Sequence, residues 1–229
     1  MEGHITPEYA ELIGIIIGDG SISYYQNYHQ FRLTISLNSK TDIVYAKERV
    51  IPLISKIWKI TPRIYFQPNE NNIKIRFYSK EIVEELLEIG LPKNKKYRHL
   101  RIPKIISNDI ELLKNCIRGI FDTDGSIFKK YGKYAQIGIK TSSERLRNEI
   151  VNLLKYLGLM PSIDKKFNYI FIHRQKEIEL FFKIIGSSNP KHILRFIKWK
   201  ETNSVPKMEE IVDMLGKWKR YCKTLPFKL

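Results

Sequence analysis

The chain has 229 residues, of which 40 are Lys or Arg and 24 are Asp or Glu, so its formal net charge is +16 at pH 7. A hydrophobic share of 43% at this length is typical of a folded protein with one or two cores and excludes a disordered tail. The positive charge is spread along the chain, which predicts an extended anionic partner such as nucleic acid. A membrane surface fits less well, because the positive charge is spread along the chain and is not concentrated on one amphipathic helix.

The cysteines and the apolar stretches indicate the compartment. Cys116 and Cys222 have no metal-ligand spacing, so neither a disulfide scaffold nor a zinc module is predicted. The aliphatic stretches are far shorter than a membrane span, and the N-terminus lacks a signal-peptide pattern. We therefore expect an intracellular protein, in the cytoplasm or an organelle matrix, with no membrane partner.

The first predicted element is a helix that begins at Pro7 and ends at Gly20. Thr6 is a good N-cap, Pro suits the first helical position, and Gly suits the C-terminal stop. The stretch at 12–22 reads L-I-G-I-I-I-G-D-G-S-I, and its Asp19 lies at the helix end that disfavours negative charge. The simplest interpretation of such a D-G dipeptide is a chain-reversing turn.

Strands follow the helix. Residues 30–37 and 72–78 alternate apolar and polar side chains, so each predicts a strand with one core face and one basic, hydrogen-bonding face. Residues 169–174, Y-I-F-I-H-R, are apolar on both faces, so their register is not predicted. Basic faces repeated over several strands of a positively charged chain favour contact with nucleic acid.

The chain contains an internal repeat. Residues 117–127, I-R-G-I-F-D-T-D-G-S-I, repeat the stretch at 12–22 and place Asp124 opposite Asp19. Three further matches follow in the same order, ending with K-E-I-V-E-E-L-L-E-I-G at 80–90 and K-E-I-E-L-F-F-K-I-I-G at 176–186. We therefore predict two copies of one module, each with the order helix–strand–strand–helix–strand–strand–helix.

The repeat divides the chain. We expect an α+β protein with a first module at 1–90, a basic linker at 91–108, a second module at 109–190 and a C-terminal extension at 191–229 that packs on the second module. The extension reads as a break, W-K-E-T-N-S-V-P, and then a basic amphipathic helix, M-E-E-I-V-D-M-L-G-K-W-K-R-Y.

The second motif helix has its own start signal. It is expected to begin near Ser107 or Asn108, with Glu111 placed for a capping box on Asn108.

Small residues indicate how the two motif helices pack. A pair with four-residue spacing lies on one face of each helix and permits close backbone approach; the residues are Gly14, Gly18, Gly119 and Thr123. If the helices pack about a pseudo-twofold axis, Asp19 and Asp124 meet at their C-terminal ends, which is costly without a cation. Carboxylates suit Mg²⁺, and two acids that bridge metals beside a basic surface predict metal-assisted phosphodiester hydrolysis.

Both stretches resemble the motif of the LAGLIDADG homing endonucleases in their single-chain, two-motif form. The resemblance covers about residues 10–186 and implies two pseudo-symmetric αββαββα modules. It also implies motif helices at the central interface and saddle-shaped antiparallel sheets over DNA. The implied protein is a monomer with internal pseudo-twofold symmetry that makes a double-strand break with short 3′ overhangs in a long asymmetric duplex.

The resemblance also implies the site. The last acids of the motifs, Asp19 and Asp124, would hold Mg²⁺ or another divalent cation such as Mn²⁺, with the carbonyls of Gly18 and Thr123 completing the shell. The first acid of the family motif is Ile17 in the first copy, a departure at a position that serves packing or capping.

The second copy keeps that acid as Asp122. The family places a basic or amide residue after the second strand to polarise the scissile phosphate, and Lys140 fits this role in the second copy. In the first copy the repeat places Asn38 there, with Lys40 close by, so the first-module assistant is left open and unequal nicking of the two strands is expected.

The polar strand faces are expected to read DNA in the major groove. Three tyrosines among the candidates, Tyr25, Tyr65 and Tyr78, could pack on the DNA backbone. The full set of candidates is Tyr25, Gln30, Arg32, Thr34, Ser36, Arg63, Tyr65, Gln67, Lys74, Arg76, Tyr78, Lys133, Gln136, Lys140 and Lys166.

Two other functions share this fold. One is an intron maturase that binds intron RNA, with or without DNA cleavage; the other is a transcription regulator, which would be expected to have lost one of the two acids. The chain has no N-terminal Cys or Ser splice nucleophile and ends L-P-F-K-L without a His-Asn pair. We therefore expect a free-standing, intron-encoded enzyme rather than part of an intein.

Overall fold

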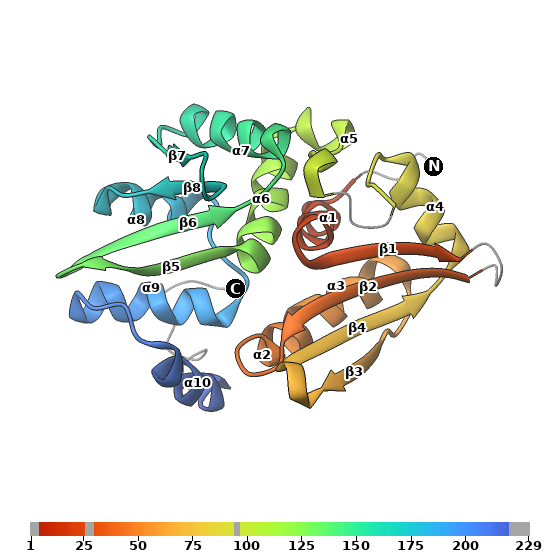
Figure 1. Cartoon of the computed structure of the whole chain (residues 1–229), viewed down its shortest axis with the longest axis horizontal. Helices are drawn as coiled ribbons and strands as arrows, with labels where there is room; N and C mark the ends of the chain where they lie inside the picture. Colours follow the sequence, from red (N-terminus) through yellow and green to blue (C-terminus); the bar gives the residue numbers. More distant parts are fainter. Residues whose placement is uncertain (1–4, 26–29, 94–96, 220–229) are drawn as a thin grey trace.

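The computed structural model describes residues 5–25, 30–93 and 97–219. Two four-stranded antiparallel sheets lie on either side of a central pair of helices, α1 and α6 (Figure 1). The strand orders are β1-β2-β4-β3 and β5-β6-β8-β7, so the second sheet repeats the topology of the first. The predicted α+β architecture of two pseudo-symmetric modules is confirmed.

The elements of the first half, in chain order, are α1 (Pro7–Asp19), β1 (Gly20–Tyr25), β2 (Gln30–Asn38), α2 (Ile43–Tyr45), a π-helical turn η2 (Ala46–Val50), α3 (Ile51–Trp58), β3 (Arg63–Gln67), η3 (Pro68–Glu70), β4 (Asn72–Tyr78) and α4 (Lys80–Glu88). The elements of the second half are η4 (Tyr97–His99), α5 (Lys104–Ser107), α6 (Ile110–Asp124), β5 (Gly125–Tyr131), β6 (Tyr134–Lys140), α7 (Glu144–Tyr156), β7 (Ser162–Asp164), β8 (Tyr169–Ile172), α8 (Gln175–Ile184), α9 (Pro190–Thr202) and α10 (Met208–Gly216).

The first motif helix begins as predicted but does not end in a turn. Thr6 Oγ1 accepts the N–H of Tyr9 at 3.2 Å, and Pro7 is the first helical residue. At the other end Gly20 has φ −81° and ψ 156°, an extended conformation, and the chain passes directly from α1 into β1. The chain-reversing D-G turn is therefore wrong. A glycine is needed here for space, because a β-carbon at Gly20 would lie 2.7 Å from Ile16 Cα.

The second motif helix begins one residue later than expected. Asp109 is its N-cap, and its Oδ1 accepts the N–H groups of Glu111 at 2.8 Å and Leu112 at 3.0 Å. Asn108 instead ends the short helix α5, so the predicted capping box on Asn108 is wrong. An Asp beside an Asn offers two equivalent caps in sequence, and the preceding turn of α5 decides between them.

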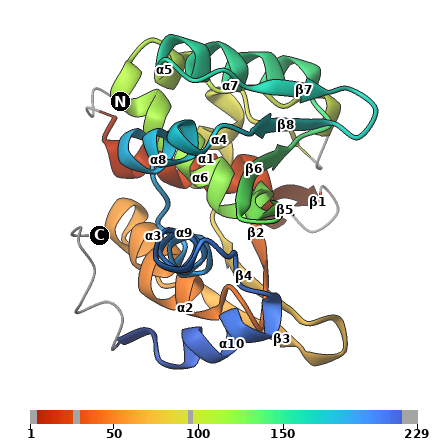
Figure 2. The ribbon, with the colours of Figure 1, turned by 90° about the vertical axis from the view of Figure 1, so that its left-hand side faces the viewer.

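The sheets bury one face each. In the first sheet Leu33, Ile35 and Ile75 are fully buried, and in the second Ile137 and Ile139 are. The buried residues of both sheets and of the motif helices belong to one continuous core. Figure 2 shows α3 and α8 towards one side of the molecule and β1 and β5 towards the other. The polar faces of both sheets are therefore on the side opposite these helices.

The C-terminal extension contains a helix, α9, that the sequence did not indicate, and its break begins at Asn203 rather than at Trp199. This extension contacts both modules. Phe196 of α9 stacks on Phe182 of α8, with ring centroids 4.0 Å apart, while Trp218 Nε1 donates to Glu48 Oε2 of the first module at 2.9 Å. A second apolar cluster around Leu194 and Leu215 packs against Val44 of α2. The division into modules at the predicted boundaries stays a prediction.

Within 5–25, 30–93 and 97–219, no helix combines the length and apolar character that a membrane crossing requires.

Candidate functional site

The site is built on the contact between α1 and α6. A β-carbon at Gly14 would clash with the carbonyl of Cys116, and one at Gly119 would lie 2.8 Å from the backbone nitrogen of Ile15. The two backbones therefore touch through these glycines, with no side chain between them. Such an approach fixes the position of both helix ends relative to each other.

The C-terminal ends of the two helices meet. A β-carbon at Gly18 would lie 2.8 Å from Thr123 Cβ and 3.3 Å from Asp124 Oδ2. The carboxylate of Asp124 therefore reaches across to the end of α1, one residue before Asp19. Both acids are partly exposed. Two negative helix ends and two carboxylates are thus concentrated at one junction between the sheets, an arrangement that favours a bound cation.

The donors at this junction are oxygen atoms. In the part of the chain that the structure describes, no group of three or more His, Cys, Asp or Glu side chains is placed to hold a metal. A metal at the junction would thus be held by the two carboxylates, and its other ligands would be oxygen atoms of backbone carbonyls or water. This donor set fits hard divalent cations such as Mg²⁺ and Mn²⁺ and does not fit a zinc site.

Asp122, the motif acid that the first copy lacks, forms hydrogen bonds inside the protein. It is fully buried and accepts hydrogen bonds from the hydroxyl of Ser187, the N–H of Ser188 at 3.0 Å and the hydroxyl of Tyr45 at 3.3 Å. Burial, and then the charge of Glu11, raise its pKa to about 7. These contacts join α6 to the first module and to the segment before α9, so Asp122 holds elements together behind the junction.

Glu11 of α1 is the acid that faces Asp122. It is fully buried and forms a bidentate ion pair with Arg49, and Arg118 Nη1 lies 3.7 Å from its carboxylate. The pair joins η2 of the first module to α1, and Arg118 comes from α6. Charges buried this way are paired, which is the condition for keeping them in a core.

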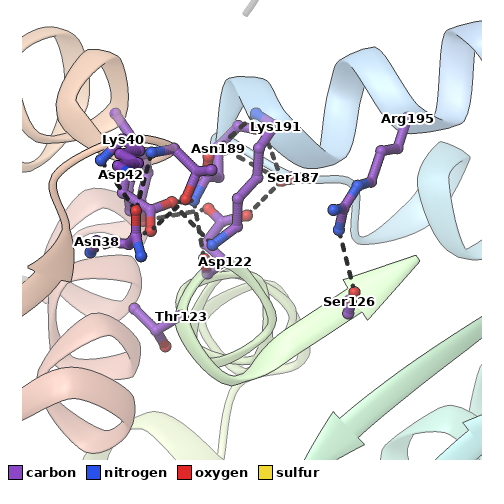
Figure 3. A network of polar contacts seen from close by, with 12 residues as sticks. Asn38, Lys40, Asp42, Asp122, Thr123, Ser126, Ser187, Asn189, Lys191 and Arg195 are labelled. Atoms are coloured by element: carbon purple, nitrogen blue, oxygen red, sulfur yellow. Dashed lines mark hydrogen bonds and ion pairs between the residues drawn. The ribbon is translucent and has the colours of Figure 1, made fainter. Parts of the chain in front are cut away.

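The first-module candidates after β2 lie in a tight turn. Asn38 Oδ1 accepts the N–H groups of Lys40 at 2.9 Å and Thr41 at 3.1 Å, so its oxygen is used in the turn (Figure 3). Lys40 is exposed at this turn. In the second module Lys140 is exposed at the end of β6, and its Nζ lies 5.6 Å from the centroid of the Tyr169 ring. Their catalytic roles stay predictions.

A further lysine lies beside this turn. Lys191 Nζ, from the first turn of α9, donates to Asp42 Oδ1 at 2.8 Å, and Asn189 Nδ2 donates to the same oxygen at 2.8 Å (Figure 3). The other carboxylate oxygen of Asp42 accepts the N–H of Asn38 at 3.3 Å. Lys191 therefore brings a cation to the end of β2, where the first module has no lysine equivalent to Lys140.

Sequence reasoning missed Lys191, although a signal was present. The last repeat match aligns Gly186 with Gly90, and continuing that alignment places Lys191 opposite Lys95, so both copies have a lysine after the same helix. Lys95 lies outside the described residues. Because the second module was taken to end at 190, Lys191 fell in the extension, in a stretch for which the sequence indicated no helix and no role.

The outer face of the first sheet, formed by the polar residues of β1–β4, is basic. Its central row pairs Ser21 with Thr34, Thr34 with Arg76 and Arg76 with Arg63. The predicted DNA-binding residues of this sheet lie on this face: Tyr25, Gln30, Arg32, Thr34, Ser36, Arg63, Tyr65, Gln67, Lys74, Arg76 and Tyr78.

Some polar side chains on this face contact one another, and three of their atoms lack a hydrogen-bond partner among the described residues. Arg32 Nη2 donates to Tyr25 Oη at 2.7 Å, and the Arg76 guanidinium lies 4.8 Å from the Tyr65 ring centroid. The Nε atoms of both arginines and Thr34 Oγ1 are buried without a hydrogen-bond partner. Buried polar groups are normally satisfied, but these three atoms are covered by protein, so a ligand on this face would reach them only if the side chains moved. Thr34 itself is only 7% exposed, which leaves it little surface for direct contact.

The predicted residues of the second sheet are more dispersed. Lys133 and Lys166 are exposed in the turns β5–β6 and β7–β8, and Lys140 ends β6. Gln136 lies opposite Phe128 and is 6% exposed. The register that the sequence did not predict is now clear, since Ile170 and Ile172 are buried and Tyr169 and Phe171 lie on the outer face. Roles in DNA binding stay predictions for both sheets.

Residues 111–186 match the sequence model of the family described as LAGLIDADG-like domain. Among solved structures, the complex of I-DmoI with DNA and Mn is 18% identical with a TM-score of 0.57 and covers 80% of this chain and 98% of its own. Full-length DUF199/WhiA from Thermatoga maritima is 17% identical with a TM-score of 0.55 and covers 95% of this chain and 68% of its own. The predicted resemblance is confirmed, and these structures share the fold.

Curated proteins also match part of the chain. Glutamine--fructose-6-phosphate aminotransferase of Methanocaldococcus jannaschii is 28% identical over 193 residues, and a polypeptide of the A-type ATP synthase of Pyrococcus abyssi is 26% identical over 158 residues. These matches cover 79% and 69% of this chain but only 16% and 14% of the relatives. The two names describe different activities, so neither activity is transferred. That the chain is free-standing stays a prediction.

Proposed function

We propose that this chain, a LAGLIDADG-fold protein, is a site-specific DNA endonuclease that makes a double-strand break by metal-dependent phosphodiester hydrolysis. The observation that carries the proposal is the meeting of Asp124 with the end of α1, beside Asp19, at the junction of two sheets. One of the neighbours by fold, I-DmoI, is named as a homing endonuclease and was solved with DNA and Mn. Intron-encoded homing is the biological role that we infer for such an enzyme.

The metal site would use Asp19 and Asp124, with the carbonyls of Gly18 and Thr123. When bound, a divalent cation neutralises charge on the scissile phosphate and lowers the pKa of a bound water. The chain's own part is to fix the two carboxylates on packed helices, so that little reorganisation is needed when DNA arrives. Lys140 in the second half and Asn38, Lys40 or Lys191 in the first would orient the phosphate and the attacking water.

The DNA would lie across the outer faces of both sheets. A net charge of +16 supplies the sequence-independent part of the affinity through release of counterions. A β-sheet face fits the major groove, where the four base pairs present different patterns of donors and acceptors. Because the chain carries both modules, one copy would suffice for an asymmetric duplex, and we propose a monomer.

The test is selection for cleavage. The purified chain is incubated in Mg²⁺ with a pool of plasmids that contain a long randomised duplex segment, and cut ends are captured and sequenced. We expect one asymmetric family of sites, cut with short 3′ overhangs. Asp19→Asn and Asp124→Asn variants and a chelator should each prevent cutting. Robust cutting by the double variant, or in chelator, would contradict the assignment.

A second candidate is a DNA-binding protein that does not cut. It is favoured by the similarity to full-length DUF199/WhiA, which covers more of this chain than I-DmoI does. Both acids are present here, and they are the groups that cleavage would require. The same pool separates the two functions, since a non-cleaving protein would retain specific duplexes on a filter and release no cut ends in Mg²⁺. Intron RNA, added as competitor, tests the maturase alternative.

A further inference from the structure

The β2–β4 pair of the first sheet can be compared with the β6–β8 pair of the second once the repeat aligns β2 with β6. The strand pairs that follow the motif helices differ by two residues, since Gly20 lies opposite Ile35 and Gly125 opposite Ile139. Ile75 of β4 lies opposite Ile35 of β2, and Ile172 of β8 lies opposite Ile137 of β6. The repeat aligns Ile35 with Ile137. On this alignment Ile75 of β4 corresponds to Ile172 of β8, and their neighbours along the two strands correspond.

At these corresponding positions the chemistry differs. Lys74 of β4 corresponds to Phe171 of β8, and Asn72 corresponds to Tyr169. One residue past Ile75 is Arg76, where the second module has His173. The strand that presents two cations in the first sheet thus presents rings in the second.

The rings of the second sheet form an ordered surface. Phe171 stacks on Tyr169 with centroids 5.2 Å apart and planes 4° from parallel, and Phe128 of β5 meets Phe171 edge-on at 6.4 Å. Gly138 lies between them, because a β-carbon there would be 3.1 Å from Phe128 and 3.2 Å from Phe171. We call these three rings, Phe128, Tyr169 and Phe171, the aromatic platform. All three are partly exposed.

Polar groups beside the platform are engaged with one another. Lys130 Nζ lies 3.2 Å from His173 Nδ1, and since an ammonium can only donate, the hydrogen of the neutral ring is on Nε2. That nitrogen lies 2.6 Å from Ser162 Oγ, which accepts its hydrogen. Asp164 Oδ1 accepts the N–H groups of Lys166 and Phe167 within its own turn. The centre of this face therefore offers apolar contact and few free hydrogen-bonding groups.

The major groove of DNA presents one apolar group, the 5-methyl of thymine. We propose that the aromatic platform reads its half of the target through thymine methyl groups, whereas the first sheet reads the other half through charge and hydrogen bonds. This inference rests on the proposed function and names the chemistry of its second half-site. Burying one methyl group contributes enough to change the dissociation constant about fourfold.

The experiment removes the methyl groups alone. Duplexes that bind the full chain in Ca²⁺ are selected from a randomised pool, and the half contacted by the second module is identified by loss of its footprint in Lys166→Ala. Thymines are then replaced by deoxyuridine, first in one half and then in the other, and dissociation constants are measured. We expect about fourfold weaker binding for each replaced thymine that faces the platform and less than a twofold change for replacements in the other half.

Matched variants connect the effect to the rings. Phe171→Ser should abolish the deoxyuridine penalty, while Lys74→Ser, the corresponding change in the first sheet, should weaken binding and keep the penalty. Phe171→Leu retains an apolar side chain and should retain most of the penalty. If the serine variant at 171 does not fold, the deoxyuridine series on the unaltered chain and on Phe171→Leu still decides the question.

The results separate this inference from the proposed function. If no duplex is enriched, or if the selected duplex is not cut in Mg²⁺, the proposed function fails. If the duplex is selected and cut but deoxyuridine is tolerated in both halves, or is equally harmful in both, only the thymine inference is overturned.

Discussion

The two sheets share one framework and differ in the face that they turn outward. Buried isoleucines recur at equivalent places, Ile35 with Ile137 and Ile75 with Ile172, because equivalent helices must pack against both sheets. The outer face of the first sheet combines arginines and Lys74 with serines and tyrosines. The second sheet presents the aromatic platform at its centre and lysines at its strand ends. The inner faces are similar because both must pack against helices. The outer faces are free to differ because each contacts its own part of the ligand.

The largest expected effect concerns the feature that both halves share. Asp19→Asn or Asp124→Asn should lower the rate of double-strand cleavage by on the order of 10³-fold, because either change removes a charge that the proposed metal needs. Asp213→Asn, on the exposed side of α10, is the control and should leave the rate unchanged. Nicking of supercoiled plasmid carrying the selected site measures each strand separately. Equal rates for variant and control would remove the acids from the reaction.

The second-largest effect should come from disrupting the contact between α1 and α6. Gly119→Ala forces a β-carbon into the backbone of α1 and should lower the free energy of unfolding by roughly 3 kcal/mol. Gly216→Ala in α10 has nothing within 4 Å of the new carbon and should change it by less than about 1 kcal/mol. Urea denaturation of both variants checks the difference. Similar stabilities would mean that the close approach of α1 and α6 is not needed.

The contrast between the outer faces predicts different salt dependences. Arg76→Gln should reduce the slope of log affinity against log salt by about 1, because one phosphate contact is lost. His173→Gln, at the corresponding position, should leave the slope nearly unchanged because the neutral imidazole releases no counterion. Filter binding from about 50 to about 200 mM salt measures both slopes. A loss of slope in both variants would contradict the difference between the sheets.

A smaller effect tests the extension. His192 of α9 is fully buried against the Phe121 ring, and burial, together with Lys191 and Arg195, holds its pKa well below the usual value. As pH falls below about 6.5, the unfolded chain takes up this proton and the folded chain does not, so stability should fall. His192→Phe removes that contribution and should flatten the loss between about pH 7 and about pH 5 in urea denaturation. An unchanged pH profile would exclude His192 as its source.

The two-module fold could be predicted from the sequence because the same sequence pattern occurs in both halves of the chain. The D-G motif at 19–20 and 124–125 and the K-E-I helix sequence at 80–82 and 176–178 appear in both halves in the same order, so each copy supported the interpretation of the other. The same reasoning anticipated that Asp19 and Asp124 lie at the ends of neighbouring helices. The exact start of α6 could not be predicted, because Asn108 and Asp109 are equally good caps and tertiary packing of α5 selects the second.

The structural features that the sequence did not predict lie in segments that are not repeated or that show no alternation of apolar and polar residues. The strand at 169–172 is apolar on both faces, so alternation carried no information about which side is buried. The α9 helix has no counterpart among the described elements of the first half that could support it. The position of Lys191 near β2 was not predicted, because the residue follows the assigned end of the repeat. Its proximity to Asp42 depends on tertiary folding, as does that of Asn189, which lies 147 positions from Asp42 along the chain.

The extension has a consequence for how the molecule melts. Asn189 donates to Asp42 and to the carbonyl of Asp122, and Trp218 donates to Glu48, so the C-terminal extension is bonded to the first module. A tandem duplication without such a closure could lose one half while the other persists. Here neither half can come apart without breaking contacts of the other, so calorimetry should record a single cooperative transition for the whole duplicated chain.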